Sequence, residues 1–507
     1  MKKYVNYNPT TYLIRPEGLH MKNFVRQALW LISLLGVFFL PACATNPVTG
    51  QQELMLLSES SEIQMGRQTD TQIEKTYGFY ESPSLNAYIQ RLGQRVAQVS
   101  HRSHLPFEFK VLDTPVVNAF AVPGGYIYLT RGILAYLNNE AEVAGVIGHE
   151  IGHVAARHSA QQYTRATFAQ IGLGLGTILS EEVAALSGVA QVGVQMLFLK
   201  FSRDNERQAD RLGVEYATRA GYDASEMANF FHTLERLDPT SDSGTLPDWF
   251  STHPAPEQRV STVRSLAVKQ ARLYGSRQQD LKTKKSAYLE VLDGLVFGED
   301  PRQGYVEADL FYHPELRFYF PSPGGWQLSN TPARVQIVNP NKSAAIVFSI
   351  DAEPSPESAA QRFATETKAQ ILQSKTMSLN SLPATMLIAD IVSNQQKLRT
   401  MSTFIAYDEK IYRFVGFCPP EVFARYQSTF QKTMTGFAPL SDPQKLDVTP
   451  DRVRVFRTDS QMTLRQALTS QGVKKDDLET AAVLNGKQLN DSVPGNTLLK
   501  WVEKTNR

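Results

Sequence analysis

GHEIGHVAARHS, at residues 148–159, is the stretch on which the fold and its chemistry depend, because it places His149 and His153 four positions apart with Glu150 after the first. Side chains four apart on an α-helix lie about 40° apart around its axis, so both imidazole rings can reach one ion. The intervening glutamate can hold a water molecule bound to that ion and accept its proton, which is chemistry suited to peptide hydrolysis. The alternative is a buried helix whose two histidines have ordinary hydrogen-bond partners.

The residues around this motif favour a helix. Asn139 and Glu142 form a start that resembles a capping box. Apolar residues then recur at helical spacing, namely Val143, Val146, Ile147, Ile151 and Val154. We therefore expect the histidine pair on a helix with one apolar side.

A catalytic zinc ion needs three protein ligands and one open position, so a third ligand must lie elsewhere. One known zinc-ligand pattern has its third histidine ten residues after the first, at position 159, but this sequence has Ser159 there. His158 is five residues from His153, about 140° around a continuous helix, so we expect it to face elsewhere. A glutamate about nineteen residues after the second histidine is also missing.

The next candidate is Glu206, which opens a helix expected to run to about Ala220. Asp210 lies one turn further, where it could hydrogen-bond a metal-binding histidine and fix its tautomer. Residue reasoning alone favours a solvated, charged helix start for this segment, and Asp210 or Glu215 would be the next ligand candidates.

The N-terminus has the pattern of an export signal. Basic residues near Met21 precede the apolar run Ala28–Leu40, which is short for a membrane span and ends before Cys43. The run resembles a bacterial lipobox, which implies a signal peptide at 1–42, a lipid on Cys43 and, because Ala44 follows, the outer membrane. A plain signal peptide or an uncleaved anchor are the alternatives.

The remaining composition bounds the architecture. The chain has 507 residues, a length typical of about three domains. The formal net charge of +2 gives no support for nucleic-acid binding. We predict an α+β multidomain protein with these parts: an anchor linker at 43–60, a mainly helical unit with a small sheet at 61–275, a linker with a short helix at 276–304, an antiparallel α+β domain at 305–440 and a β-α-α-β unit at 450–503.

Four segments together resemble the CAAX-prenyl-endopeptidase-like family of zinc metallopeptidases, in the same order along the chain. They are NAFAVPGGYIYLTRG (118–132), GHEIGHVAARHS (148–159), FSRDNERQADRLG (201–213) and STHP (251–254). The resemblance implies a gluzincin-type domain with one zinc ion on His149, His153 and Glu206, and Glu150 as general base. It also implies that the strand Asn118, Ala119, Phe120, Ala121 pairs with an extended substrate at a sheet edge. The apolar stretch 171–201, interrupted by Glu181 and Glu182, is expected to form two helices over the site.

The C-terminal segment 450–503 resembles the lysin motif that binds peptidoglycan, through VLNG (483–486) and VPGNTLL (493–499). Thr458-Asp459-Ser460 stands where such modules usually have a Gly-Asp-Thr turn, so glycan binding competes with a packing or protein-binding role. Cys418 ends a predicted strand and is expected to be a small buried apolar residue.

The leading hypothesis is a zinc endopeptidase that cleaves misfolded or stalled cell-envelope proteins from the periplasmic side of the membrane. The alternatives are a chaperone or assembly scaffold, and a metalloenzyme that acts on peptidoglycan. His253, followed by a proline that disfavours helical backbone, is expected on a turn or loop. It could donate a hydrogen bond to the oxyanion or occupy the open metal position, and Arg259 could reach the same cleft. The alternative is that His253 is a surface loop residue without a role in the site.

Overall fold

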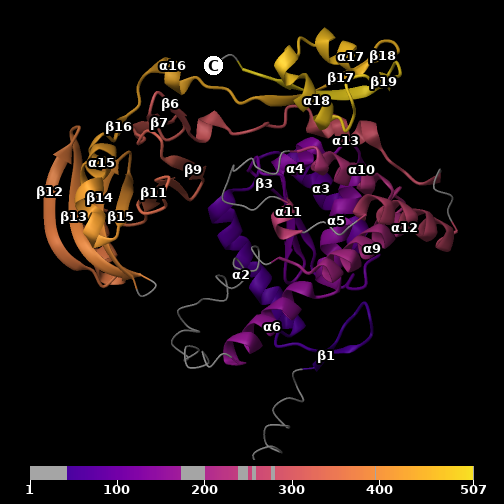
Figure 1. Ribbon diagram of the computed structural model, residues 1–507, viewed down its shortest axis with the longest axis horizontal. Coiled ribbons are helices and arrows are strands. Elements are labelled where there is room, and N and C mark those ends of the chain that lie inside the picture. The colour runs from indigo at the N-terminus through magenta and orange to yellow at the C-terminus, as the bar shows by residue number, and fades with distance from the viewer. Residues whose placement is uncertain are drawn as a thin grey trace, which may run out of the picture.

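The computed structural model combines helices and antiparallel sheets in three packed parts (Figure 1), consistent with the predicted α+β multidomain class. The predicted signal peptide and most of the two helices predicted at 171–201 lie outside the residues it describes. Within the described part of the chain, no helix combines the length and apolarity needed to cross a membrane. The described residues are 43–172, 200–237, 249–253, 258–275, 280–393 and 396–505.

Residues 43–296, here called the helical unit, surround one central helix, α5 (Glu140–Ala155). All sixteen residues of α5 are buried, so it is the core of this unit rather than one of its walls. The other helices are α2 (Glu59–Tyr77), α3 (Pro83–Ala97), α4 (Arg131–Tyr136), α6 (His158–Gly172), α9 (Arg203–Arg219), α10 (Glu226–Glu235), α11 (Trp249–Thr252), α12 (Arg259–Leu273) and α13 (Lys285–Leu292).

The start of α5 is fixed by the residues that the sequence singled out. The Asn139 side chain accepts a hydrogen bond from the backbone N–H of Glu142 at 2.9 Å, and it donates one to the Glu142 carboxylate at 3.2 Å. This cap satisfies N–H groups that would otherwise lack partners at a buried helix end.

A three-stranded sheet lies beside α5 in the order β3 (Glu108–Leu112), β5 (Tyr126–Thr130), β4 (Ala119–Val122). β4 and β5 form the predicted hairpin, whose turn is made possible by Gly124 and Gly125, both at positive φ. Among the described strands β4 pairs only with β5, so its outer edge is free.

Glycines bring α5 and α9 unusually close together. A Cβ atom added to Gly213 of α9 would lie 2.8 Å from the backbone nitrogen of His149, and one added to Gly148 would lie 2.9 Å from the carbonyl oxygen of Gly213. The backbones therefore touch directly where α5 carries its first histidine, and this contact places Glu206 and Asp210 of α9 beside it.

Helix α13 belongs to the core of the helical unit, although the sequence placed it in a linker at 276–304. Its residues Tyr288, Leu289 and Leu292 are buried in the same apolar cluster as α5, and the Tyr288 hydroxyl donates to the carbonyl oxygen of Leu134. The short helix predicted in this segment therefore forms, but its apolar side packs into the core.

The second part is an antiparallel sheet of seven strands, seen at the left of Figure 1. Helix α14 (Pro356–Glu366) covers one face through Phe363, and α15 (Phe423–Thr435) covers the other through Phe430. The sheet order is β12 (Gln370–Leu379), β13 (Leu382–Ser393), β14 (Gln396–Tyr407), β15 (Lys410–Cys418), β11 (Ala345–Asp351), β10 (Arg334–Val338), β9 (Gln327–Thr331).

A smaller four-stranded sheet adjoins it, and Cys418, at the end of β15, is buried in the same core as Phe430. The order of this small sheet is β16 (Ala438–Pro439), β8 (Phe318–Pro321), β7 (Leu310–His313), β6 (Tyr305–Glu307).

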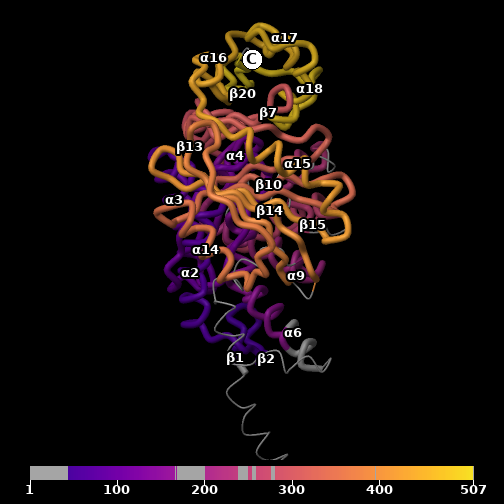
Figure 2. Tube along the Cα trace, turned by 90° about the vertical axis from the view of Figure 1, so that its left-hand side faces the viewer, coloured from indigo at the N-terminus to yellow at the C-terminus, as the bar shows by residue number. Residues whose placement is uncertain are grey.

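The C-terminal unit lies against the helical unit at the top of Figures 1 and 2. Its Leu484 and Leu498 belong to the same apolar cluster as α5. Lys500 is fully buried, and its ammonium group donates to the carbonyl oxygens of Ala135 and Leu137, both at 2.6 Å. Its elements are β17 (Arg452–Arg457), β18 (Met462–Thr463), α17 (Leu464–Ser470), α18 (Leu478–Leu484), β19 (Ser492–Val493) and β20 (Leu498–Glu503).

Candidate metal centre

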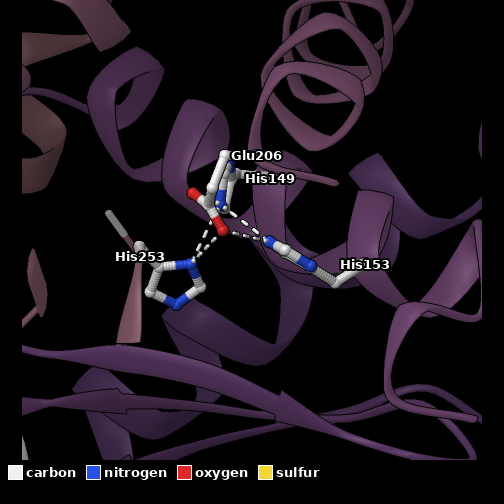
Figure 3. A group of neighbouring side chains, drawn as sticks. All are labelled: His149, His153, Glu206 and His253. Carbon is white, nitrogen blue, oxygen red and sulfur yellow. Dashed lines mark hydrogen bonds and ion pairs between the residues drawn. The ribbon is translucent and has the colours of Figure 1, made fainter. Parts of the chain in front are cut away.

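Four buried side chains from three helical segments meet at one point (Figure 3). His149 and His153 come from α5, Glu206 from the first turn of α9, and His253 directly follows α11. One donor atom from each lies within 4.8 Å of the other three. The two Nε2 atoms of His149 and His153 are 3.0 Å apart, and Glu206 lies 3.5 and 3.4 Å from them.

This donor set fits a divalent transition metal. Tetrahedral zinc ligands at about 2.1 Å from the ion lie about 3.4 Å from one another, close to the separations seen here. The Oε2 atom of Glu206 is buried and has no hydrogen-bond partner among the described residues; Arg259 Nη2 and His149 Nε2 lie 3.5 Å from it, so a metal ion bound there would stabilise it further. Two imidazoles and a carboxylate form a nitrogen and oxygen set typical of catalytic zinc.

Asp210 contacts His149 through the ring nitrogen that does not face the other metal-binding residues, and Arg259 binds Asp210. Asp210 Oδ1 lies 2.9 Å from His149 Nδ1. The Arg259 guanidinium donates to both Asp210 oxygens, at 2.7 and 2.9 Å. The Asp210 carboxylate therefore accepts a hydrogen bond from Nδ1–H of His149, which leaves Nε2 of His149 without a proton and free to bind a metal. Arg259 reaches the site, as the sequence suggested: it binds Asp210, and its Nη2 also lies 3.5 Å from Glu206 Oε2.

The ionisation of the site follows from burial and charge. Burial disfavours the imidazolium form of His149, but Asp210 and Glu206 outweigh it and raise its pKa above the usual value. Burial opposes the charged form of Glu206 too, yet His253 and the two α5 histidines hold its pKa well below normal. Burial raises the pKa of Glu150 to about 8.

Glu150 lies between the metal-binding group and the free edge of β4. Its Oε1 is buried without a hydrogen-bond partner in the described structure, 3.6 Å from His253 Nε2. The backbone of Ala121 in β4 is near enough to favour the ionised form of Glu150, which partly offsets the effect of burial on its pKa. Asn118, Ala119 and Phe120 complete the predicted substrate segment, with Asn118 just before the strand. The predicted base and the predicted substrate edge are thus adjacent.

His253 is part of the cluster and is not a surface residue. Its Nδ1 lies 3.2 Å from Glu206 Oε1 and 3.3 Å from His149 Nε2. The ring stacks on buried Trp249 at 4.5 Å between centroids. His253 lies in a bend directly after α11, in agreement with the predicted turn or loop, and its N–H donates to the carbonyl oxygen of Trp249.

His158 is not part of the metal-binding group, as expected, but it contacts the outer side of His153, which the sequence did not predict. Its Nδ1 lies 2.9 Å from His153 Nδ1 and its Nε2 lies 3.0 Å from Gln208 Oε1. The angular estimate assumed one continuous helix, but α5 ends at Ala155 and Arg157 adopts φ 58° before α6 begins. Sequence reasoning also missed Phe201, whose ring lies 4.0 Å from that of His153, although the motif at 201–213 contained it.

Comparison with known proteins agrees with this geometry. Residues 83–267, less than half of the chain, match the sequence model of Peptidase family M48. The "Beta-barrel assembly-enhancing protease" of Escherichia coli (strain K12) is 32% identical over 238 residues, which are 45% of this chain and 48% of that protein. The "Putative beta-barrel assembly-enhancing protease" of Vibrio cholerae is 32% identical over 241 residues, 45% and 49% of the two chains.

A plant protein matches over a shorter stretch. The "Mitochondrial metalloendopeptidase OMA1" of Arabidopsis thaliana is 35% identical over 164 residues, 32% of each chain. The chain thus spans about half the length of the bacterial relatives it matches. The matched region contains all four members of the buried group, which fits the zinc site of a metallopeptidase. Residues 83–267 of this chain are therefore similar in sequence to the metallopeptidases of family M48, and they contain a buried donor group that fits a metal site.

Proposed function

We propose that the whole protein is a zinc-dependent endopeptidase that cleaves misfolded or stalled cell-envelope proteins. The observation that carries the proposal is the buried group of His149, His153 and Glu206 with Glu150 beside the free edge of β4. The names of the bacterial relatives, which describe proteases that enhance β-barrel assembly, support an envelope substrate.

The chain's own residues supply binding, orientation and proton transfer. His149, His153 and Glu206 would hold the ion, which would polarise the scissile carbonyl and lower the pKa of water at the site. An extended substrate would pair with β4 through backbone hydrogen bonds, as peptides do at open sheet edges. Glu150 would accept the proton of the attacking water and return it to the leaving amine. Burial raises the pKa of Glu150 above its ordinary value, which makes it a stronger base than an exposed glutamate.

We further propose that His253 keeps the enzyme closed by occupying the fourth metal position. The sequence left two roles open, a hydrogen-bond donor to the oxyanion or a fourth ligand. Nδ1 of His253 lies as near to Glu206 and His149 as those ligands lie to each other, which favours the fourth ligand. The short helix α11 would have to move before water and substrate could enter.

The envelope location and the lipid anchor at Cys43 are part of the same proposal. Cys43 begins β1 (Cys43–Thr45), which pairs with β2 (Gln52–Leu54) at the end of the helical unit opposite the C-terminal unit (Figure 1). A lipid there would fix the protein to a periplasmic membrane surface with the metal centre in the unit nearest the anchor. The lysin-like unit is better explained as a packing module, because buried Lys500 fixes it to the helical unit.

The deciding experiment compares the parent chain with Glu150→Gln on unfolded casein. Glu150→Gln should bind zinc normally and lose nearly all cleavage, because only the proton acceptor is gone. Equal cleavage by both proteins would refute the mechanism. If Glu150→Gln still rescued every defect of a deletion strain, the scaffold or chaperone function would replace proteolysis as the main role.

Metal content tests the ligand set separately. The parent chain should hold about one zinc ion, as a three-ligand catalytic site does. Glu206→Ala should lose most of it, whereas Glu215→Ala, a change at a partly exposed carboxylate of the same helix, should not. Full zinc occupancy in Glu206→Ala would refute Glu206 as the third ligand. Incubation with purified sacculi, followed by product analysis, tests the peptidoglycan alternative.

A further inference from the structure

His153 and His158 lie together although a tight turn separates their helices. The chain leaves α5 at Ala155, reverses through Arg157 in a left-handed conformation and enters α6 at His158. The two rings meet nearly edge to face, with centroids 4.9 Å apart. His158 has no exposed surface, so its polar ring must be satisfied within the protein.

The contacts of His153 determine which of its nitrogens carries the proton. Nε2 faces the metal-binding group, 3.0 Å from His149 Nε2 and 3.4 Å from Glu206 Oε1. A ring nitrogen that binds a metal carries no proton, so the proton of neutral His153 is on Nδ1. That atom lies 2.9 Å from His158 Nδ1, which must therefore accept the hydrogen bond.

The same reasoning extends one residue further. Because Nδ1 of His158 accepts, the proton of neutral His158 is on Nε2, 3.0 Å from Gln208 Oε1. A glutamine carbonyl oxygen can only accept, so the bond runs from His158 to Gln208. The chain from Gln208 through His158 to His153 is then complete, with one proton in each hydrogen bond.

We propose that His158 is a positioning residue that fixes the tautomer and ring orientation of His153, and that Gln208 holds His158 in turn. This inference rests on the proposed metal centre. It gives the two helix histidines different outer partners, since His149 donates to the carboxylate of Asp210 and His153 donates to a neutral imidazole. Helix α9 supplies Glu206, Gln208 and Asp210, so one helix orients all three ligands.

A merely structural role for His158 predicts a different result. The ring of Phe201, 4.0 Å from His153 and 6.0 Å from His158, already packs against both histidines. An apolar residue of similar size at 158 would keep that packing but would leave the Nδ1 proton of His153 without an acceptor. Asparagine is smaller, yet its side-chain oxygen stands roughly where the imidazole Nδ1 does and can accept.

The test measures the zinc dissociation constant of the purified full chain by competition with a chelator. His158→Leu should weaken zinc binding by about 10- to 100-fold, the usual effect of removing an outer partner of a ligating histidine. His158→Asn should restore most of the affinity. His104→Leu, a change at an exposed histidine paired with Glu59, is the matched control and should bind as the parent does.

Two further measurements keep the inference falsifiable. The absorption spectrum of the cobalt-substituted protein should change in His158→Leu and be restored in His158→Asn, because it reports ligand orientation. If His158→Leu does not fold, Gln208→Leu, at a partly exposed position, should still weaken zinc binding several-fold.

Either of two results would overturn the inference. One is parent-like zinc affinity in His158→Leu, or in Gln208→Leu where that variant is the one measured. The other is an equal loss in the leucine and asparagine variants. A parent chain that binds no zinc would refute the proposed function itself, so the two failures are distinguishable.

Discussion

Replacing Gly213 by alanine should disturb the metal centre without replacing any of its ligands. The new Cβ would lie 2.8 Å from the backbone nitrogen of His149 and 3.1 Å from its Cα, whereas ordinary contacts begin at 3.4 Å. The backbones of α5 and α9 must then separate by about 0.6 Å, the difference between 3.4 and 2.8 Å. Metal–ligand distances tolerate only about 0.2 Å, so Glu206 on α9 moves out of reach of an ion held by His149 and His153.

The expected result is a loss of zinc affinity of about tenfold or more, comparable with the loss of an outer hydrogen-bond partner. The free energy of unfolding should fall by less than the cost of overpacking alone, which is about 1–3 kcal/mol. The higher helix propensity of alanine offsets up to about 1 kcal/mol of that cost. Chelator competition and urea unfolding measure the two quantities. Arg211→Ala, at an exposed position of the same helix, is the control. An increase in stability of about 1 kcal/mol with unchanged zinc affinity would refute the close-contact argument.

Three further outcomes are expected. His253→Ala should increase casein cleavage, because the fourth metal position becomes free, whereas a loss of about a hundredfold would identify an oxyanion donor instead. Cys43→Ser should abolish lipid labelling and leave a slower-migrating precursor; persistent labelling would disprove the anchor. In that variant Cys418 is the only thiol, and burial raises its pKa to about 11, so a thiol reagent at pH 8 should label native protein far more slowly than unfolded protein. Similar rates in both states would show that the thiol is accessible.

Local signals in the sequence predicted the elements around the site well. The Asn139 cap forms as expected, because it depends on neighbours within a few residues. Such features are encoded by short-range sterics and hydrogen bonds, which a single sequence displays directly.

The sequence could not show how distant segments meet. Glu206 alone resembled a solvated helix start, and its burial against α5 depends on the contact between Gly148 and Gly213. Strand β12 was missed because nearly all of its residues are exposed and it lacks the alternation that marks a half-buried strand. The contact of His158 with His153 was not predicted because a helical wheel fails once Arg157 turns the chain.

Lys500 also bears on how the protein is made. Its two acceptors, on Ala135 and Leu137, are 365 and 363 residues earlier in the chain, close to the start of the helix that carries the histidines. A ribosome releases the chain from the N-terminus, so this support is missing until residue 500 has been translated. Chains that stop early leave both carbonyl groups without this donor and the shared core without Leu498. The support beneath the α5 N-terminus is therefore complete only after Lys500 has been translated and the C-terminal unit has packed against the helical unit.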